Sequence, residues 1–316
     1  MSADKPFCSY DVLLDKLSSE KNLSVPNREH ATKLLRCHSY FALVSGYKSP
    51  FKDSGGVKYK DGTTIDDIFA LYTFDDNLRF LLLRYILIVE KHIKSSLSYS
   101  FCQCFGEKQQ HYLDECNYNN TAANHSGIVK LIGILTEVIS PPFAYHYIEH
   151  QHSKYGNIPL WVAIKALPFG SVSKLYSFSL QKVRVQVSRE FGSLLEGDLA
   201  NMLDLLTRFR NVCAHNERLF DYRYMKGAIP DTSIHARLLG PKPVHRPYAK
   251  GKSDLFAALI CLKYLLDDSE FMSLVDEIQN QLDVLLHKTA LLRLPDMLAY
   301  MGFPPHWQDI KSLPKN

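Results

Sequence analysis

Hydrophobic residues recur at helical spacing over most of the chain, and the longest such stretch runs from residue 65 to about residue 105. Apolar side chains follow one another there at steps of three and four residues: Leu78, Leu82, Tyr85, Val89, Ile93 and Leu97. Thr64 and Asp67 form a T-x-x-D signature at its start, which is typical of a helix N-terminus. The pattern therefore predicts one long helix with an apolar stripe that faces the core.

Shorter segments with the same spacing predict an all-α protein, because no alternating run of β-branched residues is long enough for a main sheet. Two amphipathic helices are expected near the N-terminus, the second capped by Asn27. Further helices are predicted at 126–139, 142–152, 161–166, 171–177, 181–191, 198–219, 255–266 and 271–287. Prolines and glycines between residues 226 and 252 predict a long non-helical excursion, after which Ser253 caps the next helix.

These elements suggest three parts: an N-terminal helical region (1–63), a main helical domain (64–290, including the excursion 226–252) and a C-terminal tail (291–316). With 316 residues, of which 46% are apolar and 22% charged, the composition is that of an ordinary globular protein with a large core.

Charge is distributed unevenly along the chain. The net charge of +4 is too small to indicate a nucleic-acid partner by itself, but residues 204–252 hold ten Lys/Arg and only four Asp/Glu. A local basic patch is expected for a partner that carries phosphates. A solvated basic face explains the charge count equally well.

Several classes of protein are disfavoured by what the sequence lacks. The N-terminal residues do not resemble a secretory signal and no apolar run reaches the length of a membrane span, so a cytoplasmic protein without a membrane partner is expected. The seven cysteines show no paired spacing, which indicates free thiols. His146, His150 and His152 lack an HExxH or CxxC companion, and nucleotide-binding glycine motifs are missing, so we expect neither a metal nor a cofactor.

The run Arg210-Asn211-Val212-Cys213-Ala214-His215 carries the most suggestive chemistry. An arginine offers a forked, permanently charged donor to phosphate oxygens, and an imidazole suits proton transfer near neutral pH. Asn211 could orient the imidazole. Together these groups meet the needs of RNA cleavage without a metal. An isolated R-x4-H pattern is nevertheless more often a packed or capping histidine beside solvated arginines.

If the helix continues to residue 219, Arg208, Asn211, His215 and Arg218 share one face. Arg210 then lies about 140° around the helix from His215. The two side chains meet at one phosphate only if the helix distorts or if a second copy in a two-fold dimer supplies the missing partner.

The segment RNVCAHNERL resembles the RN-x-x-AH-x-x-RL signature of the Abi (abortive infection) family, the AbiD/AbiF-like proteins of bacteria, within the HEPN superfamily of helical ribonucleases. Segments 35–51, 69–94 and 160–176 resemble three other blocks of that family in the same order, and the four blocks together span about residues 9 to 225. This chain departs from the pattern at Lys94, where the family usually has arginine, and at Lys165, where it usually has an acid.

The resemblance implies an HEPN-type helical bundle with an N-terminal extension, acting in phage defence as a metal-independent endoribonuclease. Arg210 and His215 would be catalytic, with Asn211 in support, in a composite site of a homodimer. RNA would be the partner, with a non-coding RNA as a further expectation. We expect five residues to contact RNA: Arg208, Arg218, Arg223, Lys94 and Glu90.

Two other classes of function stay open from the sequence. The first is an RNA-binding module that does not cleave, and the second is a helical protein that senses a phage component by protein contact.

Overall fold

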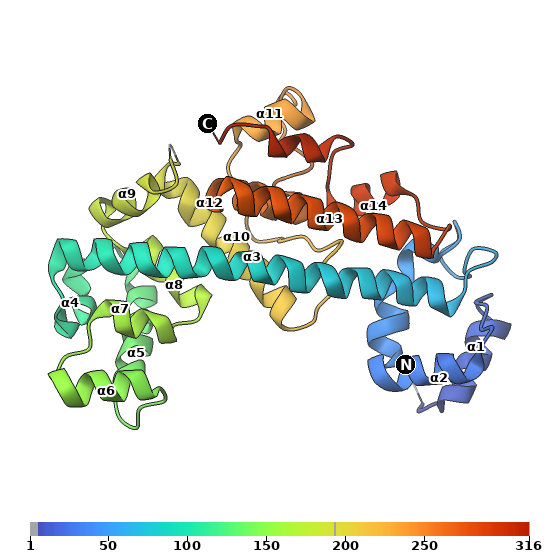
Figure 1. Ribbon diagram of the computed structural model, residues 1–316, viewed down its shortest axis with the longest axis horizontal. Coiled ribbons are helices and arrows are strands. Elements are labelled where there is room, and N and C mark those ends of the chain that lie inside the picture. The colour runs from blue at the N-terminus through green and yellow to red at the C-terminus, as the bar shows by residue number, and fades with distance from the viewer. Residues whose placement is uncertain (1–5, 193, 316) are drawn as a thin grey trace.

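The computed structural model describes residues 6–192 and 194–315, and within them the chain forms helices and no β-sheet. The all-α prediction is confirmed. The axis of the molecule is helix α3 (Ile65–Phe105), whose 41 residues span about 60 Å at 1.5 Å per residue (Figure 1). Thr64 accepts a hydrogen bond from the Asp67 backbone N–H, and the Asp67 carboxylate accepts one from the Thr64 N–H. The predicted cap therefore forms as a full capping box.

Helix α13 (Asp268–Lys288) lies along the first half of α3 and runs in the opposite direction (Figure 1). Asn77 donates to Gln281 at 2.9 Å, and Tyr85 donates to Glu277 at 2.8 Å. Later residues of α3 therefore pair with earlier residues of α13, so the two longest helices form an antiparallel pair.

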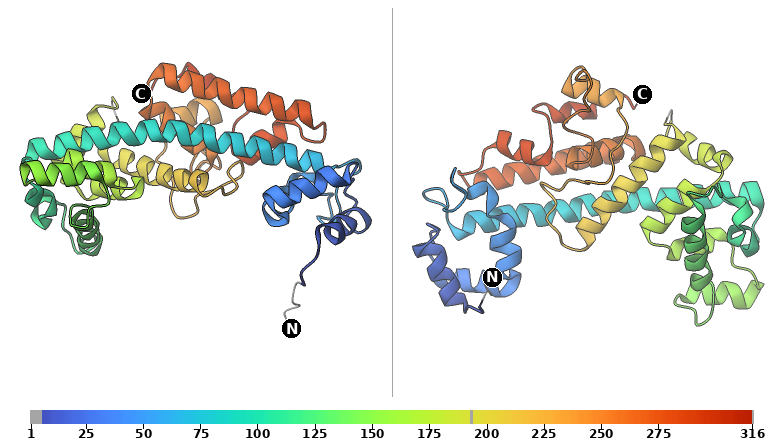
Figure 2. Two further views of the ribbon diagram at one scale, coloured as in Figure 1. Left: turned by 60° about the horizontal axis from the view of Figure 1, so that its bottom comes forward. Right: turned by 180° about the vertical axis from the view of Figure 1, so that it is seen from behind.

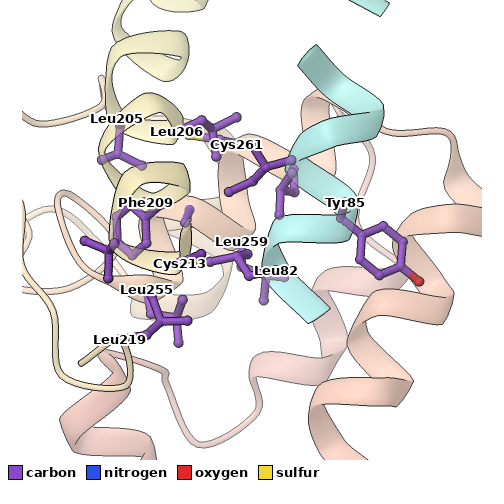
Figure 3. Packing of buried hydrophobic residues seen from close by; sticks show 14 of the residues in the cluster. Leu82, Tyr85, Leu205, Leu206, Phe209, Cys213, Leu219, Leu255, Leu259 and Cys261 are labelled. Atoms are coloured by element: carbon purple, nitrogen blue, oxygen red, sulfur yellow. The ribbon is translucent and has the colours of Figure 1, made fainter. Parts of the chain in front are cut away.

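Helix α10 (Glu196–Ala214), which ends in the candidate motif, packs against α3 and against the buried helix α12 (Leu255–Leu265). Leu82 from α3, Phe209 and Cys213 from α10, and Leu259 and Cys261 from α12 meet in this core (Figure 3). The apolar stripe predicted on α3 does face the core, and it fixes one side of the motif helix.

The elements that precede α3 and those between α3 and α10 gather at the two ends of α3, which gives an elongated molecule (Figures 1 and 2). The N-terminal region lies at the start of α3: α1 (Tyr10–Ser19), α2 (Arg28–His38), a π-helical turn η1 (Phe41–Ser45) and η2 (Ser49–Phe51). Asn27 caps α2 as predicted, since its side chain accepts from the His30 N–H.

Short helices surround the far end of α3. They are α4 (Gln109–Leu113), η3 (Glu115–Asn117), α5 (His125–Val138), α6 (His146–Tyr155), α7 (Leu160–Ala163), η4 (Ile164–Ala166), α8 (Phe169–Phe178) and α9 (Gln181–Arg189). The helix predicted at 142–152 begins only at His146, and a non-helical segment of bends precedes it.

The excursion 226–252 is not entirely without helix, contrary to the prediction, because it contains α11 (Ser233–Leu239). His235 is fully buried there. Its Nδ1 accepts from the Thr232 N–H at 3.0 Å, so its Nε2 donates to the Gly251 carbonyl at 2.8 Å. Burial lowers the pKa of His235. A neutral imidazole therefore ties α11 to the C-terminal end of the excursion.

One further expectation about the last third of the chain was wrong. The N-cap of α12 is Asp254, whose carboxylate accepts from the Ala257 N–H, and not Ser253. The C-terminal residues form α14 (Leu294–Met301) and η5 (Trp307–Lys311), which contribute Met301, Trp307 and Ile310 to the core.

Within the described residues, no helix has both the length and the apolar character needed to cross a membrane. The same part of the chain contains no group of three or more His, Cys, Asp or Glu side chains placed to hold a metal ion.

Candidate functional site

The motif helix α10 ends inside the motif and does not continue to residue 219. Asn216 adopts the left-handed conformation with φ +57°. The Glu217 N–H bonds to the Val212 carbonyl, and the Asn216 N–H bonds to the Cys213 carbonyl. This pair of bonds is the Schellman motif that closes many helix C-termini. His215 is therefore the C-cap residue of α10, and Arg218 lies beyond the helix, not on the predicted helical face.

A buried polar network holds the loop that follows His215. Asp75 on α3 is fully buried and accepts hydrogen bonds from the N–H groups of Leu219 (3.0 Å) and Phe220 (2.7 Å). It also accepts from the Tyr47 hydroxyl at 2.6 Å and from the Arg79 guanidinium at 2.7 Å. Burial raises the pKa of Asp75, and these donors oppose that shift. Arg79 in turn donates to the Glu217 carbonyl.

The network explains three of the sequence blocks structurally. Tyr47 comes from the first block, Asp75 and Arg79 from the second, and the loop from the motif block itself. Four buried donors around one carboxylate fix the backbone two to five residues beyond His215. The end of the motif helix is therefore a rigidly placed feature.

Two of the arginines expected to contact RNA form hydrogen bonds with other segments of the chain, and one of them also forms an ion pair. Arg218 donates to the Gly46 carbonyl at 2.6 Å and pairs with Asp221 at 2.7 Å. Arg223 donates to the Tyr300 carbonyl at 2.7 Å. Both guanidiniums connect the loop to other segments, and their contact with RNA stays a prediction.

Arg210 and Asn211 line a cavity of about 460 Å³ between α5, α8 and α10, which we call the motif cavity. Lys130 from α5 and Lys174 from α8 also line it, beside the rings of Phe169 and Phe178. Arg210 is half-buried, and its Nε is shielded from solvent without a hydrogen-bond partner in the described structure. The cavity thus combines three cations with an apolar wall.

His215 is exposed and does not line the motif cavity. Helix α10 is regular up to Ala214, so no distortion brings His215 round to the side of Arg210. One chain therefore presents the arginine and the imidazole on separate surfaces. Cys213, between them, is buried and its pKa is raised to about 12 by desolvation, which makes it an unreactive core thiol.

The other residues expected to bind RNA lie at different places. Glu90 and Lys94 form an ion pair of 2.7 Å on α3 and line a separate cavity of about 440 Å³ together with Trp161 and Lys165. The two positions where this chain departs from the family pattern, Lys94 and Lys165, thus lie together. Arg208 is partly exposed and lies 3.7 Å from Asp204 on the same helix.

Lys130 and Lys174 were missed by reasoning from the sequence. Each is a single lysine on a short amphipathic helix, and only tertiary packing of α5 and α8 against α10 brings them to Arg210. No signal in their local sequence indicates this arrangement.

The fold and the site define a class: an all-helical protein whose Arg-Asn…His motif forms the C-terminal end of a packed helix, fixed by a buried Asp–Arg–Tyr network. A family model described as Abi-like protein matches residues 33–221, a range that contains the motif, the network and the motif cavity. The chain belongs to this family. Membership suggests a part in abortive infection, a form of phage defence.

No curated protein and no solved structure matched the chain.

Proposed function

We propose that the protein is a metal-independent endoribonuclease of the HEPN type that acts in phage defence. The observation that carries the proposal is the motif cavity, where Arg210, Lys130 and Lys174 surround an apolar wall on the helix that ends at His215. Cations supply the phosphate contact and aromatic rings supply a surface for a base, which is the usual chemistry of single-strand RNA recognition.

The reaction would be a transesterification within the RNA. The 2′-oxygen forms a bond to the adjacent phosphorus while the bond from phosphorus to the 5′-oxygen breaks, which leaves a 2′,3′-cyclic phosphate and a 5′-hydroxyl. A base accepts the 2′-hydroxyl proton, and an acid donates a proton to the departing 5′-oxygen. His215 suits this proton transfer, and Arg210 suits the charge on the pentacoordinate phosphate.

A homodimer is part of the proposal, because one chain presents Arg210 and His215 on separate surfaces. In a two-fold arrangement, Arg210 of one copy would face the same phosphate as the second copy's imidazole. Mixing two inactive variants tests this directly. If Arg210→Ala and His215→Ala proteins regain cleavage when mixed, the site is composite, and if they stay inactive it lies within one chain.

The first experiment incubates the wild type and His215→Ala with total RNA in the presence of EDTA. We expect new ends with 2′,3′-cyclic phosphate in the wild type only. His287→Ala is a matched control, since His287 is also an exposed histidine at the C-terminal end of a helix. Cleavage that needs a divalent metal, or that survives in His215→Ala, would contradict the proposal.

The alternative is RNA binding without cleavage, which the same cations favour. It predicts that wild type and His215→Ala bind RNA equally and that neither cuts it. Binding that weakens as salt rises would separate this case from a protein that recognises only other proteins.

A further inference from the structure

A second cavity, of about 660 Å³, lies beside the end of the motif helix, and we call it the loop cavity. One wall is the loop Asn216 to Arg218, which directly follows His215, and the other is the π-helical turn η1. Its volume falls in the range of small-ligand sites. His215 is therefore the immediate neighbour in the chain of Asn216, which lines this cavity.

Four aromatic side chains line this cavity: Phe41, Tyr47, Tyr72 and Tyr222. Phe41 is 81% exposed. An exposed phenylalanine on a π-helical turn has lost the burial that usually stabilises it, and such turns are frequent at functional sites. The ring offers one open face to a flat, apolar ligand.

The charges of the loop cavity balance. Arg218 and Arg223 line it, and so do Glu217 and Asp221, of which Asp221 is paired with Arg218 at 2.7 Å. A cavity with two cations and two anions does not favour a phosphate over water. It favours an uncharged planar group whose edge carries hydrogen-bond donors and acceptors, which describes a nucleobase.

We infer that the loop cavity binds an unpaired base of the RNA strand, next to the phosphodiester presented to His215, with Phe41 as the stacking surface. This inference rests on the proposed function. The motif cavity, with its three cations, holds the phosphate side of the strand. The loop cavity selects for a base that is free to leave a helix, so cleavage occurs in single-stranded segments.

The structure also holds the two walls of the cavity together. The Arg218 guanidinium donates to the Gly46 carbonyl at 2.6 Å, and both residues line the cavity. Tyr47 donates to Asp75, which fixes the loop. A preformed cavity costs little ordering when a base enters.

The experiment measures binding of short single-stranded RNA to Phe41→Ala, all in the non-cleaving His215→Ala background. Loss of one stacking contact is expected to weaken affinity about tenfold. Phe41→Trp should retain affinity. Phe80→Ala is the matched control, because Phe80 on α3 is also exposed, at 68%, and lies outside the loop cavity.

A substrate with one abasic ribose beside the cleavage site sharpens the test. The abasic change should weaken binding to the His215→Ala protein that keeps Phe41 but add little to the loss in Phe41→Ala, since both remove the same contact. Equal affinity of Phe41→Ala and Phe80→Ala, or fully additive losses, would overturn the inference even if the wild type cleaves RNA. If the protein binds no RNA at all, the proposed function and this inference both fall.

Discussion

The buried network around Asp75 makes the strongest prediction about stability, and Asp75→Asn is the most informative change. The carboxylate has four donors around it, and one of them is the buried guanidinium of Arg79. Asparagine keeps only one acceptor oxygen, so an NH2 group must face at least one buried N–H. That mismatch costs about 1–3 kcal/mol. Removing the charge that partners Arg79 costs about 3–5 kcal/mol for a buried pair.

The second cost should lie at the low end of its range, because Arg79 keeps its bond to Asp76 at 2.7 Å. We therefore expect Asp75→Asn to lower the free energy of unfolding by about 4–5 kcal/mol. Tyr47→Phe removes one hydroxyl from the same network and should cost about 1.5–3 kcal/mol. Tyr99→Phe makes the same chemical change at an exposed ring and should cost close to nothing.

The assay is urea unfolding followed by far-ultraviolet circular dichroism, with the three variants and the wild type compared at one pH. The midpoints should shift in the order given while the slope stays constant. If Asp75→Asn loses less than about 1 kcal/mol, the carboxylate does not hold the loop as argued. If Tyr47→Phe and Tyr99→Phe behave alike, the hydroxyl is not part of the network.

Three further changes test other parts of the fold. Thr64→Ala should lower stability by about 1 kcal/mol because it removes the cap of α3, and Thr64→Ser should restore it in thermal unfolding. Burial lowers the pKa of His235 below its value in the unfolded chain. Stability should therefore be constant above about pH 6.5 and fall as pH drops below it, and the fall should be smaller in His235→Gln. Gly302→Ala should cost at least about 2 kcal/mol, since φ is +79° and the new methyl would overlap the Asp254 carboxylate; a thermal midpoint equal to wild type would contradict this.

The fold class and most helices could be predicted because hydrophobic spacing and capping residues are local signals. The capping box of α3 and the Asn27 cap formed as predicted. The errors occur where local signals compete. Proline at 142 is compatible with a helix start, but the helix begins only at His146. Four prolines concealed the short helix α11, which forms around a buried histidine that the sequence does not mark as buried.

The end of the motif helix shows what the sequence signalled and what it could not. Asparagine is one of the two residues that commonly adopt the left-handed C′ position, so Asn216 was a local signal that α10 stops at Ala214. The apolar Leu219 and Phe220, three and four residues after Asn216, instead favoured a continuing helix. In the structure, their backbone N–H groups turn to Asp75, 144 and 145 positions away in the chain. Such a distant partner outweighs helix continuation and has no local trace.

This ending changes what the motif can do. On a continuous helix, His215 and Arg218 would have formed one stripe with Asn211. With the helix closed at His215, the arginine of the motif lines a cationic cavity, while His215 is exposed at the helix end and is followed in the chain by the loop that lines an aromatic, charge-balanced cavity. Two cavities of different chemistry, one lined by the motif arginine and one by the loop after the motif histidine, suit a strand that makes phosphate contacts at one and a base contact at the other. An R-x4-H pattern by itself predicts neither cavity, because both depend on helices far away in the sequence.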